Sequence, residues 1–269
     1  MYAAGIDLGS RTIKVVFLEK LAEDGAPLMK WGVKGKHIMF PEELDPDQAA
    51  EKAFEEALRI SGISRDKVFG IVATGAGRKQ VKFAMSDVTE VSAGARGAVY
   101  LFPAARTVVD VGAEEGRGIK ADAGGRAVDF AGNEKCAAGA GSFAEAMSRA
   151  LQMTLKEFGE ASLKSDKSIP MNAQCTVFAE SEVVSLIHSA TPKNDIAKAV
   201  LDAVASRVCA MVRRVGIEGE VVLIGGMVHN AGFVQSLKAA MEVEEVSLPD
   251  MPEYISALGC ALIAADRQH

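Results

Sequence analysis

The feature that most limits the fold is an apolar, strand-like run that closes on an Asp-x-Gly turn, because it occurs once in each half of the chain. The first copy is Ala3-Ala4-Gly5-Ile6-Asp7-Leu8-Gly9, and the second is Thr107-Val108-Val109-Asp110-Val111-Gly112. Strand and helix patterns follow each copy in a similar order. A duplication on this scale predicts an α/β protein of two repeated domains that face each other across a cleft.

The first half is predicted to form three strands, a helix and a fourth strand. Two apolar runs around a short Gly/Ser turn, ending at Leu8 and covering Ile13–Leu18, indicate a hairpin. Met29–His37 is the third strand. A helix begins at Asp45 and Pro46, its N-cap and first-turn residues, and its apolar stripe is Ala50, Ala53, Phe54, Ala57 and Leu58. The strand Val68–Thr74 completes a mixed sheet with this helix packed on it.

In the second half, short strands over residues 118–122 and 126–130 follow the second Asp-x-Gly turn. A long helix is predicted from Asp195 to Val215, then a strand, Glu220–Ile224, and a final helix of small residues, Tyr254–Ala265. No low-complexity linker separates the halves, and we place the hinge between Glu90 and Phe102. The predicted domains are residues 1–95 and 96–253, with the closing segment 254–269 packed at the hinge.

Composition argues against several classes of function. The 269 residues carry a net charge of −6, which is the wrong sign for a broad nucleic-acid surface. The start lacks the pattern of a signal peptide, and no apolar run reaches the ~18 residues that cross a bilayer. The four cysteines, at 136, 175, 209 and 260, form no dense disulfide framework. We therefore expect a cytoplasmic protein that binds neither nucleic acid nor membrane.

The two Asp-x-Gly turns have the composition of phosphate-binding loops. Gly9 and Gly112 lack a Cβ atom, so backbone N–H groups of the turns can approach phosphate oxygens closely. Asp7 and Asp110 become useful if Mg²⁺, directly or through its waters, sits between them and the phosphates. One Asp-x-Gly alone is usually only a turn. Further candidate contacts to ATP are Ser10, Arg11, Thr12, the positive charge of Lys14, and Ala113.

A third glycine turn strengthens the prediction of a nucleotide site. Gly225 and Gly226 follow the strand Glu220–Ile224, and Met227 comes next. Two glycines after a buried strand allow an adenine or ribose to lie flat against the backbone. The three turns together predict binding of ATP with Mg²⁺.

Two cysteines stand where helical patterns open. Cys136 precedes apolar positions that share one helix face: Phe143, Ala146, Met147 and Ala150. Cys175 precedes a less regular set: Phe178, Val183, Leu186 and Ile187. A helix N-terminus favours the thiolate, which is the form that binds a metal or cluster. A small buried hydrophobe is the commoner fate of a single cysteine, and we interpret Cys209 and Cys260 in that way.

The order of these motifs resembles the actin, sugar-kinase and seventy-kilodalton heat-shock superfamily of ATPases, with residues 5–16 and 108–120 as its phosphate loops and 223–233 as its adenosine loop. Residues 255–261 resemble its second interdomain helix. Within the superfamily, Asn-Glu-Lys-Cys-Ala-Ala-Gly (133–139) and Cys-Thr-Val-Phe-Ala-Glu-Ser-Glu-Val (175–183) resemble the activators of 2-hydroxyglutaryl-CoA dehydratase and the ATP-binding subunits of benzoyl-CoA reductase. This resemblance implies that Cys136 and Cys175 ligate a 4Fe–4S cluster shared between two subunits. Such a cluster normally takes four thiolates, and one chain offers two.

The second phosphate loop departs from the Asp-x-Gly-Gly-Gln-Asp that the dehydratase activators usually carry. This chain has Asp110-Val111-Gly112-Ala113-Glu114-Glu115, which we interpret as resembling the D-type subunit of benzoyl-CoA reductase. Glu114 in place of the amide can accept a proton from the attacking water, so the candidate catalytic residues are Asp7, Asp110 and Glu114. A slow or inactive site and a solvated acidic turn stay open as alternatives.

The resemblance implies an ATPase subunit that couples hydrolysis to low-potential electron delivery for the reduction of an aromatic acyl-CoA. Its implied partners are a paralogous ATPase subunit or a second copy of itself, a ferredoxin-type electron donor, and the catalytic subunits of an acyl-CoA reductase or dehydratase. Three alternatives are an activator of a 2-hydroxyacyl-CoA dehydratase, a sugar or carboxylate kinase of the same superfamily, and a structural subunit that binds nucleotide without hydrolysing it.

Overall fold

The computed structural model describes residues 1–21, 31–42, 45–133, 141–171 and 176–267, which separate into two compact units. Unit 1 comprises Met1–Ala105, Ala121–Ala127 and Glu253–His269, and unit 2 comprises Arg106–Lys120 and Val128–Pro252. The boundary predicted after residue 95 falls inside unit 1, which also contains the closing helix. Among the described residues, no helix is long and apolar enough to cross a membrane.

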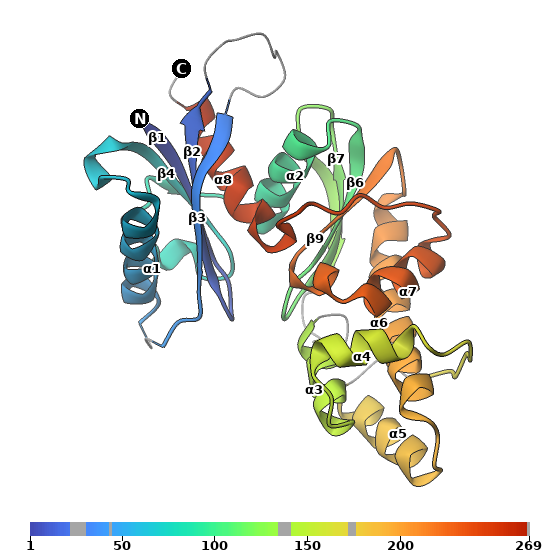
Figure 1. Cartoon of the computed structure of the whole chain (residues 1–269). Coiled ribbons are helices and arrows are strands. Elements are labelled where there is room, and N and C mark those ends of the chain that lie inside the picture. The colour runs from blue at the N-terminus through green and yellow to red at the C-terminus, as the bar shows by residue number, and fades with distance from the viewer. Residues whose placement is uncertain (22–30, 43–44, 134–140, 172–175, 268–269) are drawn as a thin grey trace. The chain divides into compact units, whose positions relative to one another are not determined.

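Unit 1 is built on a five-stranded sheet in the order β3-β2-β1-β4-β5. Its strands are β1 (Tyr2–Leu8), β2 (Ile13–Lys20), β3 (Trp31–Met39), β4 (Val68–Thr74) and β5 (Ser86–Asp87). β2 runs antiparallel to both β1 and β3, while β4 is parallel to β1 and to β5. Helix α1 (Pro46–Ser61) covers one face and α8 (Ile255–Asp266) covers the other (Figure 1). The predicted hairpin is confirmed, and β4 has the predicted bounds.

Local signals and burial explain why α1 forms where it does. The Asp45 side chain caps it by accepting a hydrogen bond from Asp47 N–H, and Gly62 ends it with a left-handed φ of +64°. Phe54 on its inner face packs against Phe17 and Phe83, with ring centroids 5.4 and 5.2 Å apart. Complete burial of such a ring stabilises the fold by about 1.5–3 kcal/mol.

The segment that we interpreted as a hinge forms helix α2 (Glu90–Leu101), which packs against α8. Thr89 caps it by accepting a hydrogen bond from Ser92 N–H over 3.2 Å. Glycines allow the two helices to touch backbone to backbone: a Cβ added to Gly97 or Gly259 would overlap a carbonyl oxygen of the other helix. Because small buried residues occupy most of α2, it lacks the one-sided apolar pattern that marks a surface helix.

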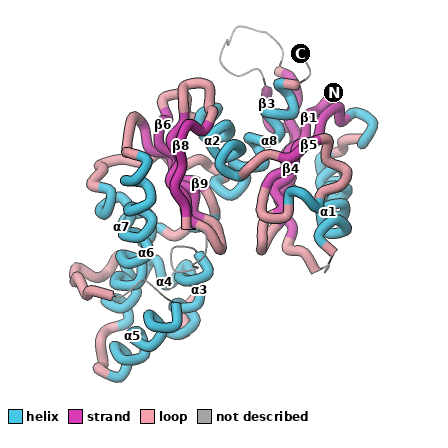
Figure 2. Tube along the Cα trace, turned by 180° about the vertical axis from the view of Figure 1, so that it is seen from behind, coloured by secondary structure: helices cyan, strands magenta, loops and turns pink. Residues whose placement is uncertain are grey.

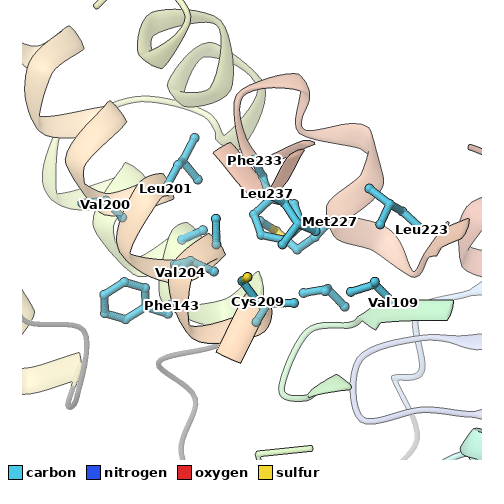
Figure 3. Packing of buried hydrophobic residues seen from close by; sticks show 14 of the residues in the cluster. Val109, Phe143, Val200, Leu201, Val204, Cys209, Leu223, Met227, Phe233 and Leu237 are labelled. Carbon is cyan, nitrogen blue, oxygen red and sulfur yellow. The ribbon is translucent and has the colours of Figure 1, made fainter. Parts of the chain in front are cut away.

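Unit 2 is built on a four-stranded sheet in the order β8-β7-β6-β9. The strands are β6 (Ala105–Val111), β7 (Gly116–Ala121), β8 (Ala127–Gly132) and β9 (Glu220–Ile224). Helices α6 (Lys193–Val215) and α7 (Ala231–Met241) pack against each other beside this sheet (Figure 2). Val109 and Leu223 from the sheet meet Val204 of α6 and Leu237 of α7 in one apolar core (Figure 3).

Three shorter helices of unit 2 pack against α6 (Figure 1). They are α3 (Gly141–Ala150), α4 (Leu155–Ser162) and α5 (Thr176–His188). The predicted inner face of α3 is confirmed, since Phe143 and Met147 are fully buried. The predicted face of α5 is wrong at two positions: Phe178 is 64% exposed and Ile187 is 43% exposed. Ala179 takes the inward position instead. Two of the large apolar side chains of α5 thus point away from the core.

Candidate functional site

The first Asp-x-Gly turn joins β1 to β2 in unit 1. Asp7 and Lys14 are paired across the hairpin, and Lys14 Nζ lies 3.1 Å from Asp7 Oδ2. The turn closes where Gly9 N–H donates to the Thr12 carbonyl over 3.2 Å. Ser10 and Arg11 at its tip are exposed. The structure brings together every residue predicted for this loop, and their contact with phosphate stays a prediction.

Unit 2 repeats this arrangement between β6 and β7. Asp110 is paired across the strands with Arg117, whose Nη1 lies 3.0 Å from Asp110 Oδ2. Gly112 N–H donates to the Glu115 carbonyl over 2.9 Å and closes the turn, on which Glu114 is exposed. Asp110 is 8% exposed, as is its counterpart in unit 1. Each unit therefore holds a buried aspartate against a cation seven residues further along the chain.

In each unit, a glycine with a positive φ lies close to the side chain of the aspartate. Gly75, after β4, has φ of +93°, and Gly225, after β9, has φ of +90°. A Cβ atom added to Gly75 would lie 2.6 Å from Asp7 Oδ1, and one added to Gly225 would lie 2.9 Å from Asp110 Oδ1. Each would also overlap a carbonyl oxygen of the neighbouring strand. Only glycine fits both positions without a backbone shift.

The third glycine turn continues from β9 into a short 3₁₀ helix, Gly226–His229. Gly226 is exposed, and a Cβ atom added there would have no neighbour within 4 Å. Met227, by contrast, is buried in the core of unit 2 (Figure 3). The open backbone at Gly226 suits a flat ligand ring, and adenosine as that ligand stays a prediction.

The N-terminus of α3 is hydrogen-bonded to the second turn. Gly141 N–H donates to the Gly112 carbonyl over 2.9 Å, and Ser142 N–H donates to the Ala113 carbonyl over 2.7 Å. These bonds satisfy two of the N–H groups that a helix start leaves without a partner inside the helix. The Met227 side chain packs against Gly141, where an added Cβ would lie 3.3 Å from its Sδ. Helix α3 is thus attached to the second and third turns together.

The predicted cluster ligands, Cys136 and Cys175, lie outside the described residues. Helix α3 begins at Gly141, α5 begins at Thr176, and the two helices pack against each other. Within the part of the chain that the structure describes, no group of three or more His, Cys, Asp or Glu side chains is arranged to hold a metal ion. The two thiolates of one chain fit half of the donor set of a four-thiolate cluster, which then needs a second chain.

The other two cysteines are core residues, as predicted. Cys209 and Cys260 are both buried, and Cys209 Sγ–H donates to the Ala240 carbonyl over 3.1 Å. Burial raises the pKa of the Cys260 thiol well above its usual value, and the negative charge of Asp7 raises it further. Burial and the nearby charge therefore favour the neutral thiol at Cys260, which agrees with its interpretation as a core residue.

Sequence reasoning assigned no role to two components of this site, Arg117 and Gly75. The signal for Arg117 is its spacing, because it follows Asp110 by seven residues just as Lys14 follows Asp7. The signal for Gly75 is its place directly after β4, which matches Gly225 directly after β9. Arg117 becomes visible when the two halves are aligned on their aspartates, and Gly75 becomes visible when they are aligned on β4 and β9.

Each unit contains a sheet, an Asp-x-Gly turn and a glycine of positive φ that lies against the aspartate. This arrangement is that of an ATPase of the actin and sugar-kinase fold. The predicted fold class is confirmed. A hexokinase of the ROK type from Thermus thermophilus shares the fold with a TM-score of 0.54 at 16% identity, over 100% of this chain and 99% of the hexokinase. At that identity the likeness concerns the fold alone.

Within this class, the chain belongs to the BadF/BadG/BcrA/BcrD ATPase family, whose model matches residues 4–264. The crystal structure of (R)-2-hydroxyglutaryl-CoA dehydratase component A from Acidaminococcus fermentans superposes with a TM-score of 0.89 at 32% identity, over 99% of this chain and 98% of that protein. The activator of 2-hydroxyisocaproyl-CoA dehydratase from Clostridium difficile, with bound ADPNP, gives a TM-score of 0.87 at 31% identity, over 99% and 95%.

Two relatives known by sequence separate the functional alternatives. The activator of lactoyl-CoA dehydratase from Anaerotignum propionicum is 36% identical over 271 residues, which cover 98% of this chain and 97% of that protein. The D-type subunit of benzoyl-CoA reductase from Thauera aromatica is 29% identical over 270 residues, 98% of this chain and 93% of the relative. The suspected family is confirmed. Within it, the dehydratase activators are more similar to this chain than the reductase subunit is, so the activator alternative has better support than our benzoyl-CoA reductase interpretation.

Proposed function

We propose that this chain is the ATP-hydrolysing activator of a 2-hydroxyacyl-CoA dehydratase, in which two copies share a 4Fe–4S cluster and use hydrolysis to deliver a low-potential electron. The observation that carries the proposal is the attachment of α3, the helix after Cys136, to the second turn through Gly141 and Ser142. Similarity to dehydratase activators over nearly the whole chain supports it.

In this proposal the Asp-x-Gly turn of each unit offers contacts to ATP. Backbone N–H groups around Gly9 and Gly112 approach the phosphates, and Lys14 adds a positive charge. The carboxylates of Asp7 and Asp110 are each a donor of the kind that suits Mg²⁺, directly or through its waters, because this ion prefers hard oxygen ligands. Both are nearly buried, which limits screening by water and strengthens their attraction to a cation.

Glu114 is the residue that we propose to act on the attacking water. It is exposed on the second turn, next to the backbone predicted to hold phosphate. Its carboxylate orients the water or accepts its proton while ATP is split into ADP and phosphate. Glu114→Ala should lower kcat for Mg·ATP hydrolysis by about 100-fold or more with little change in KM. Glu160→Ala, on the exposed face of α4, is the matched control, and equal rates in the two variants would remove Glu114 from the mechanism.

The contacts of α3 and α4 offer a route from nucleotide to cluster. A shift of the second turn on hydrolysis moves the carbonyls of Gly112 and Ala113, which hold the start of α3. After the third turn, Asn230 Nδ2 donates to the Leu155 carbonyl of α4 over 2.9 Å. The cluster, when bound, supplies a one-electron redox centre. The second turn is thus hydrogen-bonded to α3, the helix that follows Cys136 in the sequence, and the third turn is linked through Asn230 to α4.

Exposed apolar side chains on α5 support a shared cluster. Phe178, Val184 and Ile187 are exposed on the helix that begins directly after Cys175, while Ala179 and Val183 are buried. Exposed large apolar side chains on one helix are typical of an interface with another chain. A second copy related by a twofold axis brings the same helix and two more cysteines.

Cysteine variants test the cluster assignment. The wild-type chain, purified without oxygen, should contain about four iron and four sulfide ions per dimer. Cys136→Ala and Cys175→Ala should lose them and still bind ATP. Cys209→Ala, which changes a buried cysteine far along the chain, should keep them and is the control. Iron retained in Cys136→Ala would show that the ligand assignment is wrong.

Activity assays separate this function from its rivals. The chain, reduced with dithionite and supplied with Mg·ATP, is added to an oxidised 2-hydroxyacyl-CoA dehydratase with (R)-lactoyl-CoA or (R)-2-hydroxyglutaryl-CoA. We expect dehydration that depends on both ATP and reductant. Phosphorylation of glucose without any cluster would favour a kinase, and nucleotide binding without hydrolysis would favour a structural role.

A further inference from the structure

The duplicated turns carry one difference that bears on nucleotide binding: unit 1 has a lysine where unit 2 has Arg117. In both units the cation stands on the second strand of a hairpin, directly across from the aspartate. The distances from cation to carboxylate are 3.1 Å for Lys14 and 3.0 Å for Arg117. The side chains of the two cations are 14% and 13% exposed. Arg117 is thus the positional counterpart of the lysine predicted to contact phosphate.

The guanidinium of Arg117 contacts two carboxylates. Besides Asp110 it pairs with Glu115, the residue whose carbonyl closes the turn. A guanidinium has five N–H donors in a planar fork, so it can hold one acceptor while it exchanges another. Release of Asp110 would leave Arg117 anchored by Glu115 beside the turn.

We propose that Arg117 binds the phosphates of the nucleotide at the second turn by exchanging Asp110 for phosphate oxygens when Mg²⁺ or its waters engage Asp110. This inference rests on the proposed binding of ATP. The exchange keeps charges balanced: the carboxylate passes from one cation to another, and the guanidinium passes from a carboxylate to a phosphate, which it can bind in a bidentate way. Without nucleotide, the same ion pair keeps the buried Asp110 charge compensated.

A role for Arg117 that is limited to neutralising Asp110 predicts the opposite effect on nucleotide affinity. If Arg117 only compensates Asp110, its removal exposes a carboxylate to the incoming cation. The affinity for Mg²⁺-bound nucleotide is then unchanged or higher, and only the stability of the chain falls. Nucleotide affinity and thermal stability therefore distinguish the two roles.

Calorimetric titration with Mg·AMP-PNP tests the inference on the purified dimer. Arg117→Gln should weaken binding about 10- to 100-fold, the equivalent of one or two charge-assisted hydrogen bonds. Arg117→Lys should recover part of this loss because it restores the charge without the fork. Arg213→Gln removes an exposed arginine paired with Glu242 and should bind as the wild type does.

A second pair of variants keeps the test valid if Arg117→Gln does not fold. Asp110→Asn/Arg117→Gln removes both charges, so no buried ion is left without a partner, and it is compared with Asp110→Asn alone. Weaker binding by the double variant supports phosphate contact, and equal binding overturns it. No binding by the wild-type chain would overturn the proposed function as well, whereas equal affinities of wild type and Arg117→Gln would overturn this inference alone.

Discussion

Alanine at Gly225 should destabilise the chain strongly, while alanine at the adjacent Gly226 should not. Gly225 has φ of +90° and ψ of 168°, a combination that essentially only glycine adopts and that costs a residue with a side chain about 1–3 kcal/mol. Its added Cβ would overlap the Val111 carbonyl and lie 2.9 Å from Asp110 Oδ1, and relief of such overpacking costs about 1–3 kcal/mol. The expected total of about 2–6 kcal/mol is a large part of the ~5–15 kcal/mol that holds a typical protein folded.

Gly226 is the matched control because it is the next residue in the same turn. No atom lies within 4 Å of its added Cβ, so alanine there should stay within about 1 kcal/mol of the wild type. Urea denaturation followed by circular dichroism under anaerobic conditions measures both variants. Gly75→Ala should repeat the large effect in unit 1, since its Cβ would lie 2.6 Å from Asp7 Oδ1. Equal midpoints for Gly225→Ala and Gly226→Ala would refute the proposed close approach of β9 to Asp110.

Three further results are expected. Ser142→Pro removes the N–H that donates to Ala113, at a first-turn position that accepts proline. The electrons delivered per ATP hydrolysed should fall about fivefold for a lost bond of ~1 kcal/mol, while Ser142→Ala should keep the wild-type ratio. Ser165→Ala should lower the free energy of unfolding at neutral pH, because the hydrogen bond from Ser165 is the main cause that holds the pKa of Asp195 below 3.8. That stability is present above 3.8 and is lost as the pH falls through the lowered pKa, so urea denaturation should show the variant and wild type converging in acid. Iodoacetamide should modify Cys260 only in urea, as peptide mass spectrometry can show, because a buried thiol with a raised pKa carries little thiolate.

Sequence patterns predicted the elements whose apolar positions are regular. The hairpin, α1 with its Asp45 cap, and the strands β4 and β9 were found because alternation, capping and turn chemistry agree at each of them. Helix α2 was missed because glycine and alanine bury it on most sides, which leaves no period to detect. On α5, Phe178 and Ile187 were assigned to one apolar helix face by their spacing, although both are exposed in the structure.

The residues of the candidate site likewise include some that a local sequence motif reveals and some that only the folded chain brings together. Asp7, Asp110 and the glycines of the turns could be found locally, since each stands in a short motif. The bond from Gly141 to Gly112 could not, because it joins a helix start to a turn that only the folded chain brings near. Arg117 lay between these cases, since the sequence shows its spacing of seven residues from Asp110 but only the strand register shows that the two residues are paired.

Gly141 determines how closely α3 can lie to the nucleotide turns. An added Cβ would come within 3.0 Å of the Gly112 carbonyl oxygen and 3.3 Å of Met227 Sδ. A larger side chain there would lift the helix from both turns and leave the buried aspartates in place. Under the proposed function, such a variant would hydrolyse ATP without delivering electrons through the cluster. A single substitution at position 141 can therefore separate ATP hydrolysis from the electron delivery that it is proposed to drive.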